Sequence, residues 1–375
     1  MTGLRGRWAG VAVLASAAVA AVALSPGFLA QRRPDELRPG PGVTRTSWLS
    51  SYHPGLRGGP GDSPVFELAG GEPGGTVLIL GGTHADETAG YLTAVLAVER
   101  ARPRVGRLIV VPRANASGFT HTVPLEGHPP RIEIAKPDGS VRSFAIGARV
   151  SNPVHQWPDP QVYVQPGSGQ RLSGIDTRNL NRAYPGRADG TLTEQIAFAI
   201  TRLIEEEEVD LAFDLHEAAP EYPVVNTIVA HERASDLAAL VSMDLDEAGI
   251  RIGLEASPRQ LRGLSHREWG DSTPVLAILL ESTNPAQGRL RGRTDAKLVI
   301  TGRDRFYELA GARGRLTVPF GPDGWPLELR VARHLATVTR FVEDFSMLEP
   351  GRAVVIEGLP SYRELVDGGV GRFLN

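Results

Sequence analysis

The chain has 375 residues, enough for one large or two modest domains, with 41% hydrophobic and 22% charged residues, as in ordinary soluble globular proteins. Its net charge of −3 lacks the basic excess of nucleic-acid-binding proteins, so we expect no nucleic-acid partner. The sequence contains no cysteine, which excludes disulfides and thiolate metal ligands. Any zinc would therefore be held by histidine and carboxylate side chains.

The first residues of the chain have the pattern of an export signal. Arg5 and Arg7 precede an almost uncharged stretch, Trp8 to Ala30, that is rich in alanine and valine and contains small residues suited to cleavage. The stretch is also about long enough to span a bilayer uncut. We therefore predict an exported, periplasmic or extracellular protein, with residues 1–33 as either a cleaved signal peptide or a membrane anchor.

Composition divides the rest of the chain into three parts. Residues 34–63 are rich in proline, glycine and arginine, which is typical of a linker or a surface wrap. We expect one globular domain over residues 64–345 and a C-terminal tail over residues 346–375.

Apolar runs and helical patterns alternate from residue 64 onward. The runs predict strands at 76–80, 107–111, 209–215, 224–230 and 275–280, with further candidates at 315–320 and 353–358. Helical spacing predicts helices at 86–100, 191–208 (with Thr193 as N-cap), 234–248 and 327–345. Continuous apolar strands separated by helices are typical of a sheet buried on both faces. We therefore predict an α/β fold with a mixed, largely parallel central sheet, helices on both faces and an apolar leader helix before it.

Several predicted strands end at side chains that can bind a metal. The stretch "GGTHADETAG" (81–90) places His84 and Glu87 after one strand, His216 follows "AFDL", and Glu281 follows "VLAILL". If these strands are neighbours, His84, Glu87 and His216 converge as a catalytic zinc set, with the fourth position left for water. Glu281 would remain free to act as a general base.

A simpler interpretation of the first motif stays open. His84 and Glu87 could cap the helix that follows, with the glycines allowing the turn. His216, taken alone, could be a hydrogen-bonded histidine at the rim of the sheet. The joint placement of these residues at strand ends favours the metal site.

Four stretches in order carry a family resemblance: "GGTHADETAG" (81–90), "DTRNLNRAYPG" (176–186), "DLHEA" (214–218) and "LLESTNPAQG" (279–288). They resemble the zinc carboxypeptidase-like superfamily, and within it the succinylglutamate desuccinylase/aspartoacylase branch of N-acyl amino acid deacylases. The resemblance covers about residues 64–290. It implies that the domain over residues 64–345 is the catalytic domain of a zinc hydrolase.

The resemblance also implies a role for each matching residue. His84, Glu87 and His216 would bind Zn²⁺, and Glu281 would be the general base and acid. Asn181 and Arg182 stand at the pair that holds the free carboxylate of the substrate, and a guanidinium is well suited to grip a carboxylate with two hydrogen bonds.

Two positions near that pair are less clear. Arg178 is a candidate for polarising the scissile carbonyl, in competition with Arg171. Carboxypeptidases of the superfamily have an aspartate two residues before the asparagine, where it orients a zinc-bound histidine. This chain has Asn179 there, and Asp176 could substitute.

Two further stretches could shape the site. The segment 120–170 is long and without clear periodicity, which is typical of a lid or pocket wall. The stretch "RGLSHREWGD" (262–271) offers His266, Arg267 and Trp269 as lining of a specificity pocket, or else forms an exposed basic loop.

Together these features predict an exported zinc hydrolase that cleaves an amide bond next to a free carboxylate, with an N-acyl amino acid as the favoured substrate. Two alternatives stay open: a metallocarboxypeptidase acting on short peptides, cell-wall peptides included, and a non-catalytic binding protein with the same fold. The membrane is a partner only if the N-terminal segment stays uncut, and the sequence does not set the oligomeric state.

Overall fold

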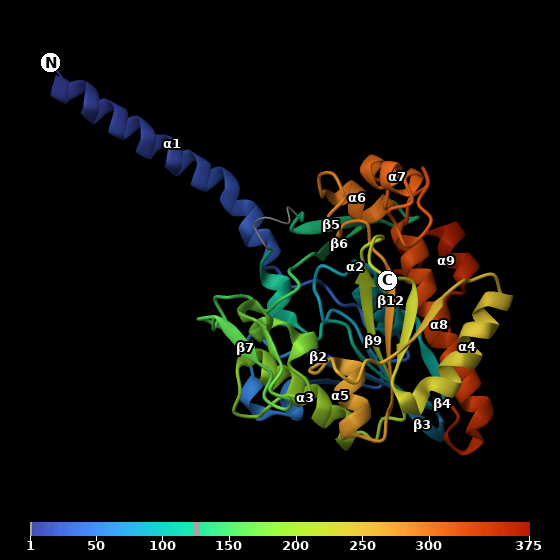
Figure 1. Cartoon of the computed structure of the whole chain (residues 1–375). Helices are drawn as coiled ribbons and strands as arrows, with labels where there is room; N and C mark the ends of the chain where they lie inside the picture. The colour runs from blue at the N-terminus through green and yellow to red at the C-terminus, as the bar shows by residue number, and fades with distance from the viewer. Residues whose placement is uncertain (1, 123–127) are drawn as a thin grey trace.

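The computed structural model describes residues 2–122 and 128–375. Figure 1 shows a layered α/β body from which helix α1 (Thr2–Gln31) projects. Within the described residues the main sheet has nine strands, in the order β1-β2-β4-β3-β9-β12-β10-β11, with β13 paired to β4. The inner strands run parallel: β4 (Arg102–Val111), β3 (Glu72–Leu80), β9 (Leu211–Ala218) and β12 (Leu276–Thr283). This confirms the predicted α/β fold and its mixed, largely parallel sheet.

The outer strands make the sheet mixed. Strands β1 (Arg45–Trp48) and β2 (Pro64–Ala69) pair with each other antiparallel, β2 pairs antiparallel with β4, and β10 (Thr227–Ala230) pairs antiparallel with β12. Strand β11 (Gly253–Ala256) runs parallel to β10, and β13 (Val355–Glu357) pairs antiparallel with β4.

Helices cover both faces of the sheet, which explains the continuous apolar strands. Val77 and Ile79 of β3 pack on one side with helices α2 (Thr88–Arg100), α4 (Ser235–Glu247) and α8 (Leu327–Leu348). Leu78 and Leu80 pack on the other side with α3 (Leu192–Glu206) and α5 (Ser265–Ser272). Because successive side chains of a strand point to opposite faces, a sheet buried on both faces needs apolar residues at every position.

Smaller elements surround this body. Two hairpins are formed by β5 (Arg131–Ala135) with β6 (Val141–Ala145) and by β7 (Val162–Val164) with β8 (Arg171–Ser173). The remaining helices are α6 (Ala296–Thr301), α7 (Arg305–Ala312) and α9 (Tyr362–Gly368). The first hairpin and most of the second lie within the segment predicted as a lid or wall, of which residues 123–127 fall outside the described residues.

The predicted linker and tail are both part of the folded body. Leu49, Tyr52 and Leu56 are buried against α3, next to the edge strand β1. At the other end, β13 joins the sheet and α9 packs on α8 with Leu365 buried. A composition rich in proline and glycine indicates irregular backbone, but single apolar residues within it are enough to anchor the segment on the core.

Two local predictions are wrong. Helix α3 is capped by Thr191 and not by Thr193, because the Thr191 hydroxyl accepts from the Glu194 N–H while the Glu194 carboxylate accepts from the Thr191 N–H. This capping box was readable from the T-x-x-E spacing. Residues 315–320 form no strand in the described structure, whereas the helix predicted at 327–345 is confirmed and continues to Leu348.

The N-terminal helix has the length and composition of a membrane span. The span Arg7–Gln31 has a mean hydropathy of 2.0, and its apolar window is not buried in the body, whereas Gln31 at its end is buried. The same properties belong to secretory signals, so export and anchoring stay predictions.

Candidate metal centre

A glycine turn brings His84 over the end of the sheet. Strand β3 ends at Leu80, and Gly82 adopts a φ of 69°, in the left-handed region that favours glycine. At Gly81 a Cβ atom would lie only 2.9 Å from the Cβ of Ala94, so α2 can pack close to the turn. The two glycines therefore let the chain reverse tightly and place the following histidine beside β9.

The structure brings His84, Glu87 and His216 together in a buried cluster. Glu87 Oε1 lies 2.7 Å from His84 Nδ1, and Glu87 Oε2 lies 2.9 Å from His216 Nδ1. The two Nδ1 atoms are 3.1 Å apart. All three side chains are about 1% exposed, and their candidate ligand atoms lie within 4.8 Å of one another. This set of donors could hold one metal ion.

Glu87 does not cap the helix that follows. It occupies the N-cap position of α2, yet its side chain makes no capping hydrogen bond. The N–H of Ala89 donates instead to Glu217 Oε2 at 2.8 Å, and the Glu217 N–H donates to Glu87 Oε2 at 3.1 Å. The capping interpretation of Glu87 is therefore wrong, because a neighbouring carboxylate does the capping and Glu87 turns to the histidines.

His84 is held from behind by a neutral amide. Its Nε2 lies 3.0 Å from Asn179 Oδ1, and Asn179 Nδ2 donates to Asp176 Oδ1 at 3.3 Å. An Nε2–H that donates to the amide oxygen leaves Nδ1 as the ligand atom. Asn179 thus occupies the orienting position that an aspartate has in the carboxypeptidases, and Asp176 supports it from one step further away.

His216 is held from behind by a carboxylate. Its Nε2 lies 2.8 Å from Asp214 Oδ2, and the Thr83 hydroxyl donates to Asp214 Oδ1 at 2.7 Å. Asp214 and His216 are two residues apart on β9 and therefore point to the same face of the sheet. The carboxylate fixes the ring so that Nδ1 faces Glu87 and His84.

The electrostatics of the cluster favour a bound cation. Burial lowers the pKa of His84 to about 4. Burial also opposes the charge of His216, but Asp214 and Glu87 outweigh it and hold the pKa of His216 well above its ordinary value. Burial would raise the pKa of Glu87, but the two histidines hold it well below the ordinary value. The two carboxylates that contact His216 therefore favour a positive charge at this point, which a divalent ion could supply in place of the proton.

Glu281 lies beside the cluster on the neighbouring strand. In the parallel pairing of β12 with β9, Glu281 stands opposite His216. Burial raises the pKa of Glu281 to about 8, with His216 lowering it and Glu87 raising it. Its Oε2 is buried and has no hydrogen-bond partner in the part of the chain that the structure describes. This carboxylate is free to exchange a proton with a bound water or substrate.

Arg182 lies within electrostatic range of Glu281, and Asn181 precedes it in the chain with its side chain held against α5. Asn181 Oδ1 accepts from the Ser265 N–H at 2.8 Å, so its NH₂ group is the end left to donate. Burial lowers the pKa of Arg182, and nearby Glu281 raises it. The pair therefore offers an amide donor and a guanidinium close to the candidate base.

Arg178 is already bound to other groups. Its Nε and one terminal nitrogen donate to Asp159 at 2.7 and 2.8 Å, and the other terminal nitrogen donates to the Ser151 carbonyl at 2.6 Å. The competing Arg171 is exposed on β8. Each guanidinium nitrogen of Arg178 thus already has a hydrogen-bond partner in the body. Its role at the scissile carbonyl stays a prediction.

Sequence reasoning missed Arg149 and Gln287. One Arg149 terminal nitrogen donates to Glu87 Oε1 at 3.0 Å, and Gln287 Nε2 donates to the same oxygen at 3.2 Å. The Arg149 side chain is 43% exposed and comes from the predicted pocket wall after β6. Gln287 stands in a quoted motif and could have been found there, but no periodicity marks Arg149.

His266, Arg267 and Trp269 are buried and make contacts within the body. Trp269 is fully buried with its ring centroid 5.3 Å from that of Tyr184, and His266 Nδ1 lies 2.7 Å from the Ser257 hydroxyl. Arg267 is buried in ion pairs with Glu232 and Asp271. Their burial excludes an exposed basic loop, and a role of the three side chains in a specificity pocket stays a prediction.

Comparison with known proteins supports the resemblance. Residues 167–268 match the model of the succinylglutamate desuccinylase/aspartoacylase catalytic domain, and this span includes Asn181, Arg182 and His216. An N-alpha-acetyl-L-2,4-diaminobutyric acid deacetylase from Halomonas elongata is 28% identical over 171 residues. That alignment covers 45% of this chain and 35% of the deacetylase, so the match spans about a third of the relative's length. The resemblance to this family of deacylases is confirmed for the matched part of the chain.

Solved structures with a similar arrangement include enzymes of both branches. A succinylglutamate desuccinylase from a Silicibacter species has 20% identity and a TM-score of 0.38, over 61% of this chain and 55% of its own. A metallo-carboxypeptidase from Burkholderia cenocepacia has 14% identity and a TM-score of 0.45, over 86% of this chain and 68% of its own.

Proposed function

We propose that this chain is a zinc-dependent amidohydrolase that removes the acyl group from an N-acyl amino acid. The observation that carries the proposal is the convergence of His84, Glu87 and His216 at the end of parallel strands, with Glu281 opposite His216 on the next strand. The match to the deacylase family model and the activity named for the Halomonas relative support the choice of substrate class.

The donor set supports zinc as the metal. Two imidazoles and one carboxylate, with no thiolate in the chain, are a usual ligand set of hydrolytic zinc sites that leave a position open. A bound zinc ion would lower the pKa of its water toward neutrality and polarise the carbonyl under attack.

Glu281 would move the proton. It would take a proton from the attacking water and deliver it to the leaving nitrogen, which makes it base and then acid in one cycle. Its buried position supports this, because burial raises the pKa of Glu281 to about 8, near the pH at which it must exchange protons.

Asn181 and Arg182 would hold the free carboxylate of the substrate by an amide hydrogen bond and a charge-assisted pair. For the scissile carbonyl we propose Arg149 rather than Arg178. Arg149 donates to Glu87 and is part-exposed, whereas the guanidinium of Arg178 is already bound to Asp159 and Ser151.

We further propose that the enzyme works outside the cytoplasm. The support is helix α1, whose apolar window from Arg7 to Gln31 could serve as a signal or an anchor. Either role would carry the catalytic domain across the membrane.

A hydrolysis screen tests the proposed function. N-acetyl amino acids and short peptides are offered to the purified protein with and without a chelator, and we expect chelator-sensitive release of acetate from the acyl amino acids. Release of C-terminal residues from peptides alone would favour a carboxypeptidase, and no hydrolysis of either class with zinc supplied would contradict both enzymes.

The carboxylate clamp has its own test within the screen. Replacing Arg182 by alanine should raise KM for free-acid substrates by about 10- to 100-fold, because a charge-assisted interaction is lost. The KM of the same variant for the C-terminally amidated substrate should change little. Arg202→Ala, on the exposed face of α3, is the control and should leave both KM values unchanged. Equal losses on both substrates would contradict the clamp.

A further inference from the structure

Helix α8 carries three arginines that point into the folded body or its rim, and one of them lacks an acidic partner. Arg330 lies 2.8 Å from Glu217, and Arg340 is paired with Asp244 and Asp344. Among the described residues no carboxylate lies within ion-pair distance of Arg333, although only 7% of it is exposed. Carboxylate partners therefore account for the burial of Arg330 and the placement of Arg340, but not for the burial of Arg333.

The partners of Arg333 are neutral groups. One terminal nitrogen donates to the Arg251 carbonyl, and the guanidinium lies 5.8 Å from the ring centroid of Trp325. Its Nε is buried without a hydrogen-bond partner in the described part of the chain. Burial lowers the pKa of Arg333, with Tyr362 giving partial compensation. A buried cation with only neutral partners is a favourable place for an incoming anion.

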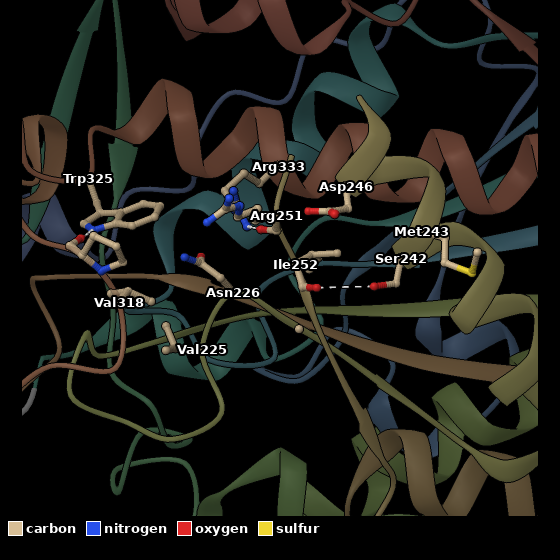
Figure 2. Close-up of a pocket in the computed structure, with 12 residues that line it drawn as sticks. Val225, Asn226, Ser242, Met243, Asp246, Arg251, Ile252, Val318, Trp325 and Arg333 are labelled. Carbon is tan, nitrogen blue, oxygen red and sulfur yellow. Dashed lines mark hydrogen bonds between the residues drawn. The ribbon is translucent and has the colours of Figure 1, made fainter. Parts of the chain in front are cut away.

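Arg333 opens on a cavity of about 720 Å³, in the size range of small-molecule sites. Figure 2 shows Arg333, Arg251, Asn226 and the indole of Trp325 around this space, and Arg333 is joined to Arg251 through the Arg251 backbone carbonyl. The remaining walls are largely apolar and include Val225, Val318, Pro319 and Ile252.

The charges of the lining indicate the charge of the ligand. Arg251 and Arg333 bring two positive charges, and Asp246, exposed on α4, is the carboxylate among the described lining residues. The resulting charge of +1 suits a monoanion, and the indole with the apolar walls suits a planar or branched hydrocarbon body. We propose that this cavity is a second binding site, which takes a small organic monocarboxylate with an aromatic or branched apolar body.

The cavity is separate from the metal centre but adjoins the strand that carries Glu281. Arg333 belongs to α8, on the opposite side of the sheet from α5, whose Ser265 contacts Asn181. Asn226 Oδ1 accepts from the Thr283 N–H at 3.0 Å, two residues beyond Glu281. A ligand that contacts Asn226 would therefore lie one hydrogen bond away from the end of β12, and none of the residues that line the cavity is among the candidate metal-site residues.

The test measures binding of phenylacetate to the full chain by isothermal titration calorimetry, with phenylacetamide and acetate as comparison probes. We expect saturable binding of phenylacetate and at least about tenfold weaker binding of the neutral amide and of acetate. Arg333→Met should weaken phenylacetate binding by at least about tenfold, since a charge-assisted contact is lost. The exposed Arg313→Met serves as the matched control and should bind as the parent does.

A second set of measurements separates this cavity from the metal centre and from misfolding. Binding should persist after chelator treatment and in Arg182→Ala, because neither change touches the cavity. If Arg333→Met fails to fold, Trp325→Ala provides a second test. Trp325 lies in a loop and lines the cavity, so its removal should also weaken phenylacetate binding. Binding that is lost with chelator, binding of the amide as tight as that of the acid, or unchanged binding in both cavity variants would overturn the proposal.

Discussion

The two histidines of the candidate metal centre both turn Nδ1 toward Glu87 and toward each other. The groups that hold the other ring nitrogen differ between them. His216 stands at the end of β9, and a buried carboxylate, Asp214, lies behind it on the same strand. His84 stands in a glycine turn, and the neutral amide of Asn179 lies behind it. The pKa of His216 is held well above its ordinary value by Asp214 and Glu87 against the effect of burial. Burial and the charge of Arg149 lower the pKa of His84 to about 4, and the amide of Asn179 adds no negative charge to oppose them.

This contrast suits a site that would hold a metal ion and still let the ion act as a Lewis acid. A carboxylate behind a histidine increases its basicity and its hold on the metal, whereas an amide fixes the ring without adding negative charge. With one charged and one neutral support, the centre carries less negative charge than two carboxylates would give, so a bound cation would keep more of its power to acidify water.

The largest effect is expected for a substitution of Glu281, which leaves both Asp214 and Asn179 in place. Glu281→Gln should keep the bound metal while kcat falls by about 10²- to 10⁴-fold, because the glutamine cannot exchange a proton. Metal analysis of the variant, alongside single-turnover hydrolysis, checks both parts. Turnover within twofold of the parent would remove Glu281 as the base, and loss of the metal would place it among the ligands.

A substitution at Asp214 would make the two supports alike. Asp214→Asn gives His216 the same neutral partner that His84 has, and we expect metal affinity to fall by about 10- to 100-fold. Competition with a chromogenic chelator at fixed pH measures this. Because Asp214 stabilises the protonated His216 in the metal-free protein, we also expect the metal-free variant to unfold at a lower temperature than the metal-free parent. An unchanged affinity would show that the charge behind His216 has no influence.

The reverse substitution sharpens the same comparison with a smaller effect. Asn179→Asp gives His84 a charged partner, and we expect metal affinity to rise by no more than about tenfold. Asp176, 3.3 Å from the present amide nitrogen, would repel the new carboxylate and limit the gain. NMR titration of the metal-free variant should show a raised pKa for His84. A pKa that stays where it was would contradict the role of Asn179.

A further prediction concerns His334, a buried histidine on helix α8. Burial lowers the pKa of His334 to about 3, and the charge of His216 contributes. Between pH 6.5 and 3 the unfolded chain binds this proton and the folded chain does not. The free energy of unfolding should therefore fall as the pH drops through about 6.5, by up to about 1.4 kcal/mol per pH unit for this group.

His334→Leu should flatten that part of the pH dependence in the metal-free protein. Urea unfolding at several pH values between about 4 and 7 measures the slope for parent and variant. An identical slope in the two proteins would show that His334 titrates normally in the folded state.

Strong periodic signals made the sheet and the convergence of the cluster predictable. Continuous apolar strands indicate a sheet buried on both faces. Polar residues at the carboxyl ends of neighbouring parallel strands lie close together, which made the cluster predictable. The spacing of Asp214 and His216 on one strand also carried a signal, since side chains two apart share a face. The support behind His216 could therefore have been predicted from the sequence as well.

Other parts of the site had no local signal. Arg149 reaches Glu87 from an irregular segment whose path depends on tertiary packing. Asn179 departs from the carboxypeptidase pattern, and only the contact between its Oδ1 and His84 Nε2 shows that the amide takes the place of the carboxylate. In the same way, the segments around Leu49 and Leu365 are packed by single apolar contacts that composition does not reveal.

The metal content of the purified protein tests the account most directly. The central claim is that His84, Glu87 and His216 share one divalent ion, so elemental analysis after dialysis against zinc should find about one zinc per chain. His216→Ala should reduce this to near zero while the circular dichroism spectrum stays that of the parent. A parent protein that retains no zinc after this treatment, or a His216→Ala variant that retains as much as the parent, would contradict it.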